Sequence, residues 1–124
     1  MIYPLSSTGI ITYSSNPWRC TIEVDDNISK YYRHLCYCSE HLKLNVPLFP
    51  AHISVSRLQT PVFFEFWGSL NNAEVEFQYS QDIRVDRCFY VIDVQCDIIN
   101  NLRIMFGLKP IDDPHITIGN SKNL

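Results

Sequence analysis

The chain has 124 residues, a net charge of −3 and a hydrophobic fraction of 46%. This length suits one domain with its own core, and an aromatic content of 13% argues against a disordered chain. The net negative charge argues against binding of long nucleic acid, although a single pocket could still bind the phosphate of a small nucleotide. No apolar run is long enough to span a bilayer, so we expect no membrane partner.

The first half of the sequence predicts an early strand pair, a helix and a third strand from its apolar periodicity. These elements are strands at 9–13 and 18–24, a helix at 27–42 and a strand at 51–57. Asp25 or Asp26 offers an N-cap for the helix. Pro47 and Pro50 lie in the loop that ends the helix, and Pro61 breaks the strand that follows.

The second half predicts a similar order of elements. They are strands at 62–67, 74–79, 88–94 and 114–119, with a helix at 97–106. Gly107 fits the C′ position of that helix. Glu74 and Glu76 alternate with apolar residues and indicate a solvated strand face. No linker or low-complexity stretch divides the chain, so residues 1–124 are expected to form a single domain.

One tetrapeptide pattern occurs twice, as His52-Ile53-Ser54-Val55 and as His115-Ile116-Thr117-Ile118. Side chains at positions i and i+2 of a strand share a face, so each copy presents an imidazole and a hydroxyl on one side. The branched apolar residues then point into a core. Each copy also follows a strand and a helix, which predicts two lobes with pseudo-twofold symmetry whose motifs meet where the lobes join. Two imidazoles and two hydroxyls around one space would suit a phosphate group.

The five cysteines are odd in number and lack metal-ligand spacing, and no secretory signal opens the chain. We therefore expect reduced thiols in a cytoplasmic protein. His34 and His41 are seven residues apart on the first predicted helix and could share a face, but solvated positions are favoured over a zinc site. No metal or cofactor is expected.

The two motifs, together with their flanking residues, resemble the two-histidine phosphoesterase superfamily, which has the LigT-like fold. The flanking residues are Tyr31-Tyr32-Arg33, Pro47 and Arg57 for the first motif, and Leu102-Arg103, Phe106-Gly107-Leu108 and Gly119 for the second. They are similar to a small viral branch that includes RNA-repair-like proteins and the anti-CBASS phosphodiesterases. Leu58-Gln59 stands where that branch often has Gly-Glu, so no acidic residue is assigned there.

The resemblance implies an α+β fold with two small antiparallel sheets, each carrying a helix, and an active site in the cleft between them. It also implies metal-independent chemistry in which His52 and His115 act as acid and base while Ser54 and Thr117 hold the phosphate. Histidine suits both roles near neutral pH. Which histidine takes which role stays open. Tyr13 is the candidate for stacking on a base, and Arg57 is the candidate for pairing with a phosphate.

Three functions are compatible with these residues. The favoured one is hydrolysis of cyclic di- or oligonucleotide second messengers, by a viral protein in the host cytoplasm that evades immune signalling. The second is cleavage of 2′,3′-cyclic phosphates at RNA ends, as in RNA repair. The third is a non-catalytic fold that sequesters a nucleotide. The base and linkage preference and the oligomeric state are left open.

Several other side chains are predicted to be structural. Tyr31, Tyr32, Trp18 and Trp67 are expected to pack against the sheet or at its rim. Arg33 and Arg103 are expected to form surface ion pairs on the two helices. The loop at 68–72 could form a lid, although nothing in the sequence requires one.

Overall fold

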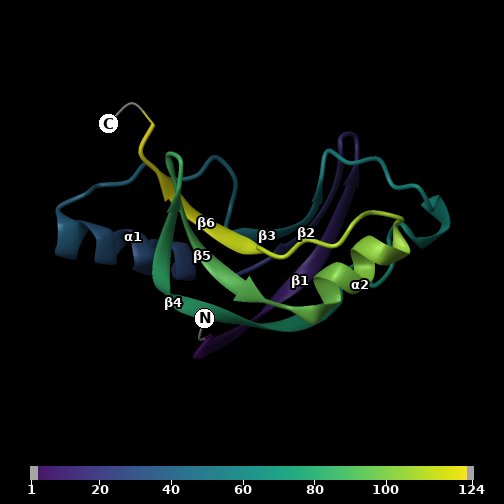
Figure 1. Ribbon diagram of the computed structural model, residues 1–124, viewed down its shortest axis with the longest axis horizontal. Helices are drawn as coiled ribbons and strands as arrows, with labels where there is room; N and C mark the ends of the chain where they lie inside the picture. The colour runs from purple at the N-terminus through teal and green to yellow at the C-terminus, as the bar shows by residue number, and fades with distance from the viewer. Residues whose placement is uncertain (1–2, 123–124) are drawn as a thin grey trace.

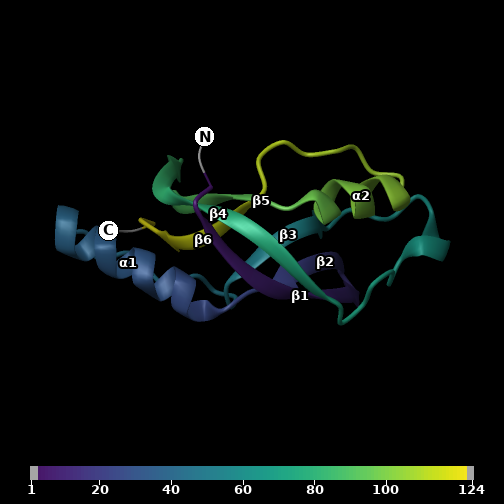
Figure 2. The same ribbon diagram turned by 90° about the horizontal axis from the view of Figure 1, so that it is seen from below.

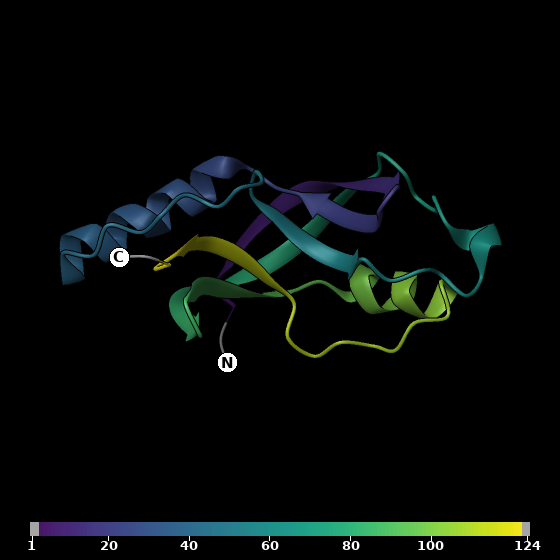
Figure 3. The same cartoon turned by 90° about the horizontal axis from the view of Figure 1, so that it is seen from above.

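The computed structural model describes residues 3–122 and shows an α+β fold, as the sequence predicts. Its elements are β1 (Leu5–Ser15), β2 (Trp18–Glu23), α1 (Asp26–Glu40), β3 (His52–Arg57), a 3₁₀ helix η1 (Phe64–Phe66), β4 (Glu74–Asp86), β5 (Phe89–Gln95), α2 (Asp97–Met105) and β6 (His115–Asn120). The two helices lie toward opposite ends of the molecule (Figures 1 and 3). No helix among the described residues is both long enough and apolar enough to cross a membrane.

The six strands form one closed antiparallel sheet in the order β1-β2-β3-β6-β5-β4. The expectation of two separate small sheets is therefore wrong. The physical reason is that β1 pairs with β4 over six positions, from Leu5↔Tyr79 to Ile10↔Glu74, where two separate sheets would each leave an unpaired edge. Figure 2 shows β1 and β4 running side by side.

The order of strands reads the same from either end if β1, β2 and β3 are exchanged for β4, β5 and β6. The helices follow the same exchange, because α1 lies between β2 and β3 and α2 lies between β5 and β6. The packing crosses over: α1 packs against β6, and α2 packs against β3. Each helix therefore covers the His-containing strand of the other half of the chain.

The helices begin and end within two residues of the predicted positions. The Asp25 side chain accepts a hydrogen bond from the backbone N–H of Asn27 at 2.9 Å, which caps α1. Gly107 follows α2 with a φ of +81°, a conformation that glycine adopts without strain. The first helix ends slightly earlier than predicted, because His41 takes a left-handed conformation with a φ of +55°.

The predicted strand at 62–67 is wrong, since this segment is a loop that contains η1. The backbone N–H groups of Val62 and Phe63 both donate to the carbonyl of Phe106, at 2.8 and 3.1 Å, so the segment is tied to the end of α2 instead of to a strand. The predicted strand at 74–79 continues to Asp86, because its second half pairs with β5. Glu74 and Glu76 are exposed, as predicted.

The core contains the branched apolar residues of both motifs, one face of each helix and inward-facing residues of the other four strands. Ile53, Val55, Ile116 and Ile118 are at most 1% exposed. Tyr32 packs among them from α1, and its hydroxyl donates to the carbonyl of Ser80 at 2.9 Å. Tyr31 is 58% exposed, so the prediction that both tyrosines pack inside holds for Tyr32 alone.

Two β-bulges interrupt the strands that carry the motifs. On β3, Ser54 pairs with Thr21 and Ser56 pairs with Cys20, so Val55 has no partner on β2. On β6, Thr117 pairs with Val91 and Gly119 pairs with Tyr90, which leaves Ile118 in the corresponding position. Both bulges fall on the last residue of the tetrapeptide.

An arginine from the helix of the opposite half binds each bulge. Arg103 of α2 donates to the carbonyl of Val55 at 2.8 Å, and Arg33 of α1 donates to the carbonyl of Ile118 at 2.7 Å. Arg103 is only 5% exposed and also donates to the Lys109 carbonyl and to Gln59. The prediction that Arg33 and Arg103 form surface ion pairs is therefore wrong, because their partners are backbone carbonyls of the bulged strands.

Substituting Arg103 with Met should lower the free energy of unfolding by about 2 kcal/mol or more, because buried acceptors would lose a charged donor. Arg33→Met should cost less, since Arg33 is half-buried and makes one such bond. Urea denaturation at neutral pH measures both variants, with the exposed Lys30→Met on α1 as the control. Equal losses in all three variants would contradict a role for Arg103 at the bulge.

Candidate active site

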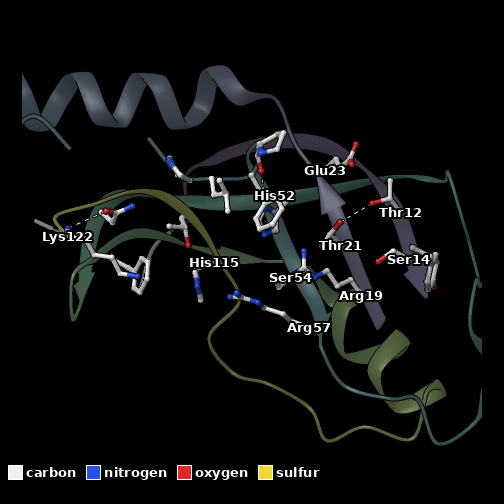
Figure 4. Close-up of a pocket in the computed structure, with 18 residues that line it drawn as sticks. Thr12, Ser14, Arg19, Thr21, Glu23, His52, Ser54, Arg57, His115 and Lys122 are labelled. Atoms are coloured by element: carbon white, nitrogen blue, oxygen red, sulfur yellow. Dashed lines mark hydrogen bonds between the residues drawn. The ribbon is translucent and has the colours of Figure 1, made fainter. Parts of the chain in front are cut away.

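The two motifs face each other where β3 meets β6. The ladder between these strands in the described part of the chain is the single antiparallel pair Ile53↔Ile116, and both of these side chains are fully buried. Antiparallel geometry then sets His52 opposite Thr117 and Ser54 opposite His115, all on the face away from the core. The four side chains line one pocket of about 600 Å³ (Figure 4). The predicted convergence of both motifs is thus present in the structure.

Both imidazoles are held in the same way. His52 Nδ1 lies 2.8 Å from the carbonyl oxygen of Pro50, and His115 Nδ1 lies 2.9 Å from the carbonyl oxygen of Asp113. A carbonyl oxygen can only accept a hydrogen bond, so Nδ1 carries a proton in each ring. In the neutral form of the ring, Nε2 is then the nitrogen without a proton. Neutral Nε2 can accept a proton and protonated Nε2 can donate one, which are the two tasks of acid–base catalysis.

Each histidine has an acidic residue opposite it on the neighbouring strand. Glu23 of β2 pairs in register with His52 and lines the pocket. Asp93 of β5 pairs with His115, but both of its oxygens accept hydrogen bonds from Arg84, the shortest at 2.8 Å. The hydrogen bond to Asp93 raises the pKa of the Arg84 guanidinium. The two histidines therefore differ, because the carboxylate beside His115 is occupied by an arginine.

The two residues predicted to bind substrate both line the pocket, but in different environments. Arg57 lies at the exposed end of β3, and Figure 4 shows its side chain extended in the direction of His115. The ring of Tyr13 packs edge-on against Trp67 and Phe106, with centroids 4.9 and 6.0 Å away. The contacts of Trp67 with Tyr13 and Phe106 and of Trp18 with Trp67 confirm that both tryptophans are packing residues. A stacking role for Tyr13 remains a prediction.

Tyr13 is also tied to the loop that follows η1. Its hydroxyl donates to the carbonyl of Ser69 at 2.6 Å, and burial is the main reason that its pKa is raised well above the ordinary tyrosine value. Burial likewise raises the pKa of the neighbouring Cys20 thiol to about 12. The loop at 68–72 is therefore held at Ser69 by a partly buried hydrogen bond.

Several pocket residues were not identified from the sequence. They are Thr12, Ser14, Arg19, Thr21, Glu23, Leu48, Phe49, Phe89, Asn120 and Lys122. The alternation of Arg19, Thr21 and Glu23 along one strand could have shown that they share a face. Which face this is depends on the pairing with β3, which the sequence does not show. Within residues 3–122, no three His, Cys, Asp or Glu side chains cluster as metal ligands would.

Comparison with known proteins provides no assignment for the chain. No protein-family model, no curated protein and no solved structure matches it.

Tyr13→Phe should make the free energy of unfolding less dependent on pH between 10 and 12. Because the folded protein holds the Tyr13 proton more tightly than the unfolded chain, its contribution is complete below pH 10 and is lost as pH rises further. The variant should also lose about 1 kcal/mol at pH 8 with the bond to Ser69. Urea denaturation at pH 8 and pH 11 tests both effects, and parallel pH curves for variant and parent would contradict the first.

Proposed function

We propose that the protein is a phosphodiesterase that cleaves nucleotide phosphodiester bonds by metal-independent acid–base catalysis. The observation that supports this best is the pocket itself, in which His52, Ser54, His115 and Thr117 converge from β3 and β6. The matched binding of both Nδ1 atoms to carbonyls adds to it, because it leaves Nε2 of each ring as the nitrogen that can accept or donate a proton.

The proposed reaction needs one proton acceptor and one proton donor. For a 3′–5′ linkage, one imidazole removes the proton of the neighbouring ribose 2′-hydroxyl, whose oxygen then attacks phosphorus. The bond from phosphorus to the 5′-oxygen breaks, and the other imidazole protonates that oxygen as it leaves. Ser54 and Thr117 donate hydrogen bonds to the non-bridging oxygens, where charge grows in the transition state. For a 2′,3′-cyclic phosphate, water is the attacking group, the bond from phosphorus to one of the two ribose oxygens of the ring breaks, and the other imidazole protonates that oxygen.

We propose a cyclic di- or oligonucleotide as the substrate. A pocket of about 600 Å³ suits a small nucleotide. The net charge of −3 disfavours long RNA, which weakens the alternative of RNA-end repair. The resemblance to the anti-CBASS branch supports the same choice and suggests a viral protein that removes an immune signal in the host cytoplasm. In this proposal the fold corresponds to two pseudo-symmetric lobes, β1-β2-α1-β3 and β4-β5-α2-β6, whose sheets have merged into one.

Replacing either catalytic histidine should abolish most of the activity. His52→Ala and His115→Ala should each lower kcat by about 10²- to 10⁴-fold, since each removes one proton-transfer group. The assay follows cyclic di- and trinucleotides and an RNA with a 2′,3′-cyclic phosphate end by chromatography, in the presence of EDTA. His34→Ala, which removes an exposed histidine from α1, is the matched control and should retain activity.

The substrate panel separates the candidate functions. Cleavage of cyclic messengers that is lost in both variants supports the proposal, and cleavage of the RNA end alone supports RNA repair instead. If no substrate is cleaved while nucleotides still bind, the protein sequesters its ligand and the enzymatic proposal is wrong.

The two hydroxyls should contribute to the transition state more than to substrate binding. Ser54→Ala and Thr117→Val should each lower kcat by about 10²-fold with little change in KM, because each removes one donor to the developing charge. The buried Ser56→Ala on β3, whose hydroxyl has no hydrogen-bond partner in the described residues, is the control and should leave kcat unchanged. A loss confined to KM would place the hydroxyls in ground-state binding.

A further inference from the structure

The ends of the pocket differ although the fold that builds them is pseudo-symmetric. Beyond the motif on β3, Arg57 pairs in register with Arg19 of β2. Beyond the motif on β6, Asn120 pairs in register with Phe89 of β5. All four residues line the pocket. Two arginines thus occupy one end of the pocket at positions where the other end has a phenylalanine and an asparagine.

The bulge at Val55 is what brings Arg57 to this end. In a regular strand, residue 57 would face away from residues 52 and 54, because side chains alternate. The extra residue shifts the alternation by one, so Arg57 joins His52 and Ser54 on the pocket face. The bulge at Ile118 shifts the alternation on β6 in the same way, so Asn120 joins His115 and Thr117 on the pocket face.

The arginine pair has no acidic partner in the described part of the chain. Like charges directly opposite each other on neighbouring strands are destabilising, yet neither arginine forms an ion pair within residues 3–122. Arg19 has its guanidinium 5.0 Å from the centroid of the Phe49 ring, and its Nε atom is buried without a hydrogen-bond acceptor among those residues. A buried donor without an acceptor costs free energy, and the Arg19 side chain that carries it lines the pocket, where an anion would find two guanidinium groups that are unpaired in the described part of the structure.

The charge of the pocket lining also favours an anionic ligand. Its lining carries three basic side chains, Arg19, Arg57 and Lys122, against the single carboxylate of Glu23. This excess lies on a protein whose net charge is −3. A phosphate between the two histidines carries one negative charge as a diester, so the lining can hold one more anionic group.

The end of the pocket that holds Arg19 and Arg57, here called the arginine end, lies on the side of His115. Antiparallel pairing at Ile53↔Ile116 sets Ser54 opposite His115, and Arg57 is the next pocket residue along β3 after Ser54. Figure 4 shows Arg57 extending from β3 in that direction. At the other end, Lys122 lies 5.2 Å from the centroid of the Phe89 ring, and the Asn120 side chain already bonds to Asn45.

We propose that Arg19 and Arg57 form a subsite for a second phosphate group of the substrate, next to His115. The proposal rests on the proposed function, because the first phosphate is the one held between the two histidines. It selects ligands with two phosphates, such as a cyclic dinucleotide, over a nucleotide with a single 2′,3′-cyclic phosphate. It also sets a direction, with the second phosphate at the arginine end and not at the Phe89 end.

Binding of linear dinucleotides with and without a 5′-phosphate tests the subsite without requiring catalysis. The ligands are pApA against ApA and pUpU against UpU, measured by calorimetry on the His52→Ala protein so that turnover does not interfere. The 5′-phosphate should improve binding by about 10- to 100-fold for at least one base, as expected for a charge-assisted contact. Adding Arg19→Gln and Arg57→Gln should reduce that gain to nearly onefold while binding of ApA and UpU changes little.

A double variant of two exposed lysines, Lys30→Gln and Lys43→Gln, removes the same charge away from the pocket and should keep the full gain. Thermal melting of the arginine variant should show no loss of Tm, because the substitution relieves repulsion between neighbours. A gain from the 5′-phosphate that survives both arginine substitutions overturns the proposal, as does the absence of binding by all four ligands at millimolar concentration. A phosphate preference that depends on the arginines in a protein without turnover would support the subsite and overturn the proposed catalysis alone.

Discussion

The crossed contacts between each helix and the opposite motif strand are the constraint on which the site depends. Each motif ends in a bulged residue whose carbonyl is bound by an arginine, Arg103 at Val55 and Arg33 at Ile118. Without these donors the bulged carbonyls would be buried polar groups lacking a partner, which is costly inside a protein. The bulges decide which residues after each motif reach the pocket, so the helices influence the site without contacting it.

The bulges also explain how a sheet whose strand order reads the same from both ends produces an asymmetric pocket. The same backbone irregularity occurs on β3 and β6, and in both cases it places the second residue after the bulge on the pocket face. The residues delivered there differ, because Arg57 and Arg19 meet at one end while Asn120 and Phe89 meet at the other. The repeated tetrapeptides thus supply two histidines in matching positions, and the residues outside the tetrapeptides make the two ends of the pocket chemically different. Glu23 and Asp93 extend this asymmetry to the histidines, since only Asp93 is bound by an arginine.

Much of the local structure was predictable because it depends on neighbouring residues. Helix α1 begins after its Asp25 cap, and Gly107 follows α2, because capping and left-handed turns are properties of short sequences. The segment 62–67 was mispredicted because its aromatic residues resemble a strand, whereas its backbone bonds to Phe106. The binding of Arg33 and Arg103 to bulged strands is not predictable from local sequence, because their acceptors lie 85 and 48 residues away in the chain.

The repeated tetrapeptide is visible in the sequence alone. Because side chains alternate along a strand, the sequence also determined that each histidine shares a face with its hydroxyl residue. The tertiary structure decided that β1 pairs with β4 and closes the sheet, and that the two bulges bring Arg57 and Asn120 into the pocket. A bulge depends on the register between strands and on an arginine from a distant helix. These are long-range contacts, and no local pattern of residues encodes them.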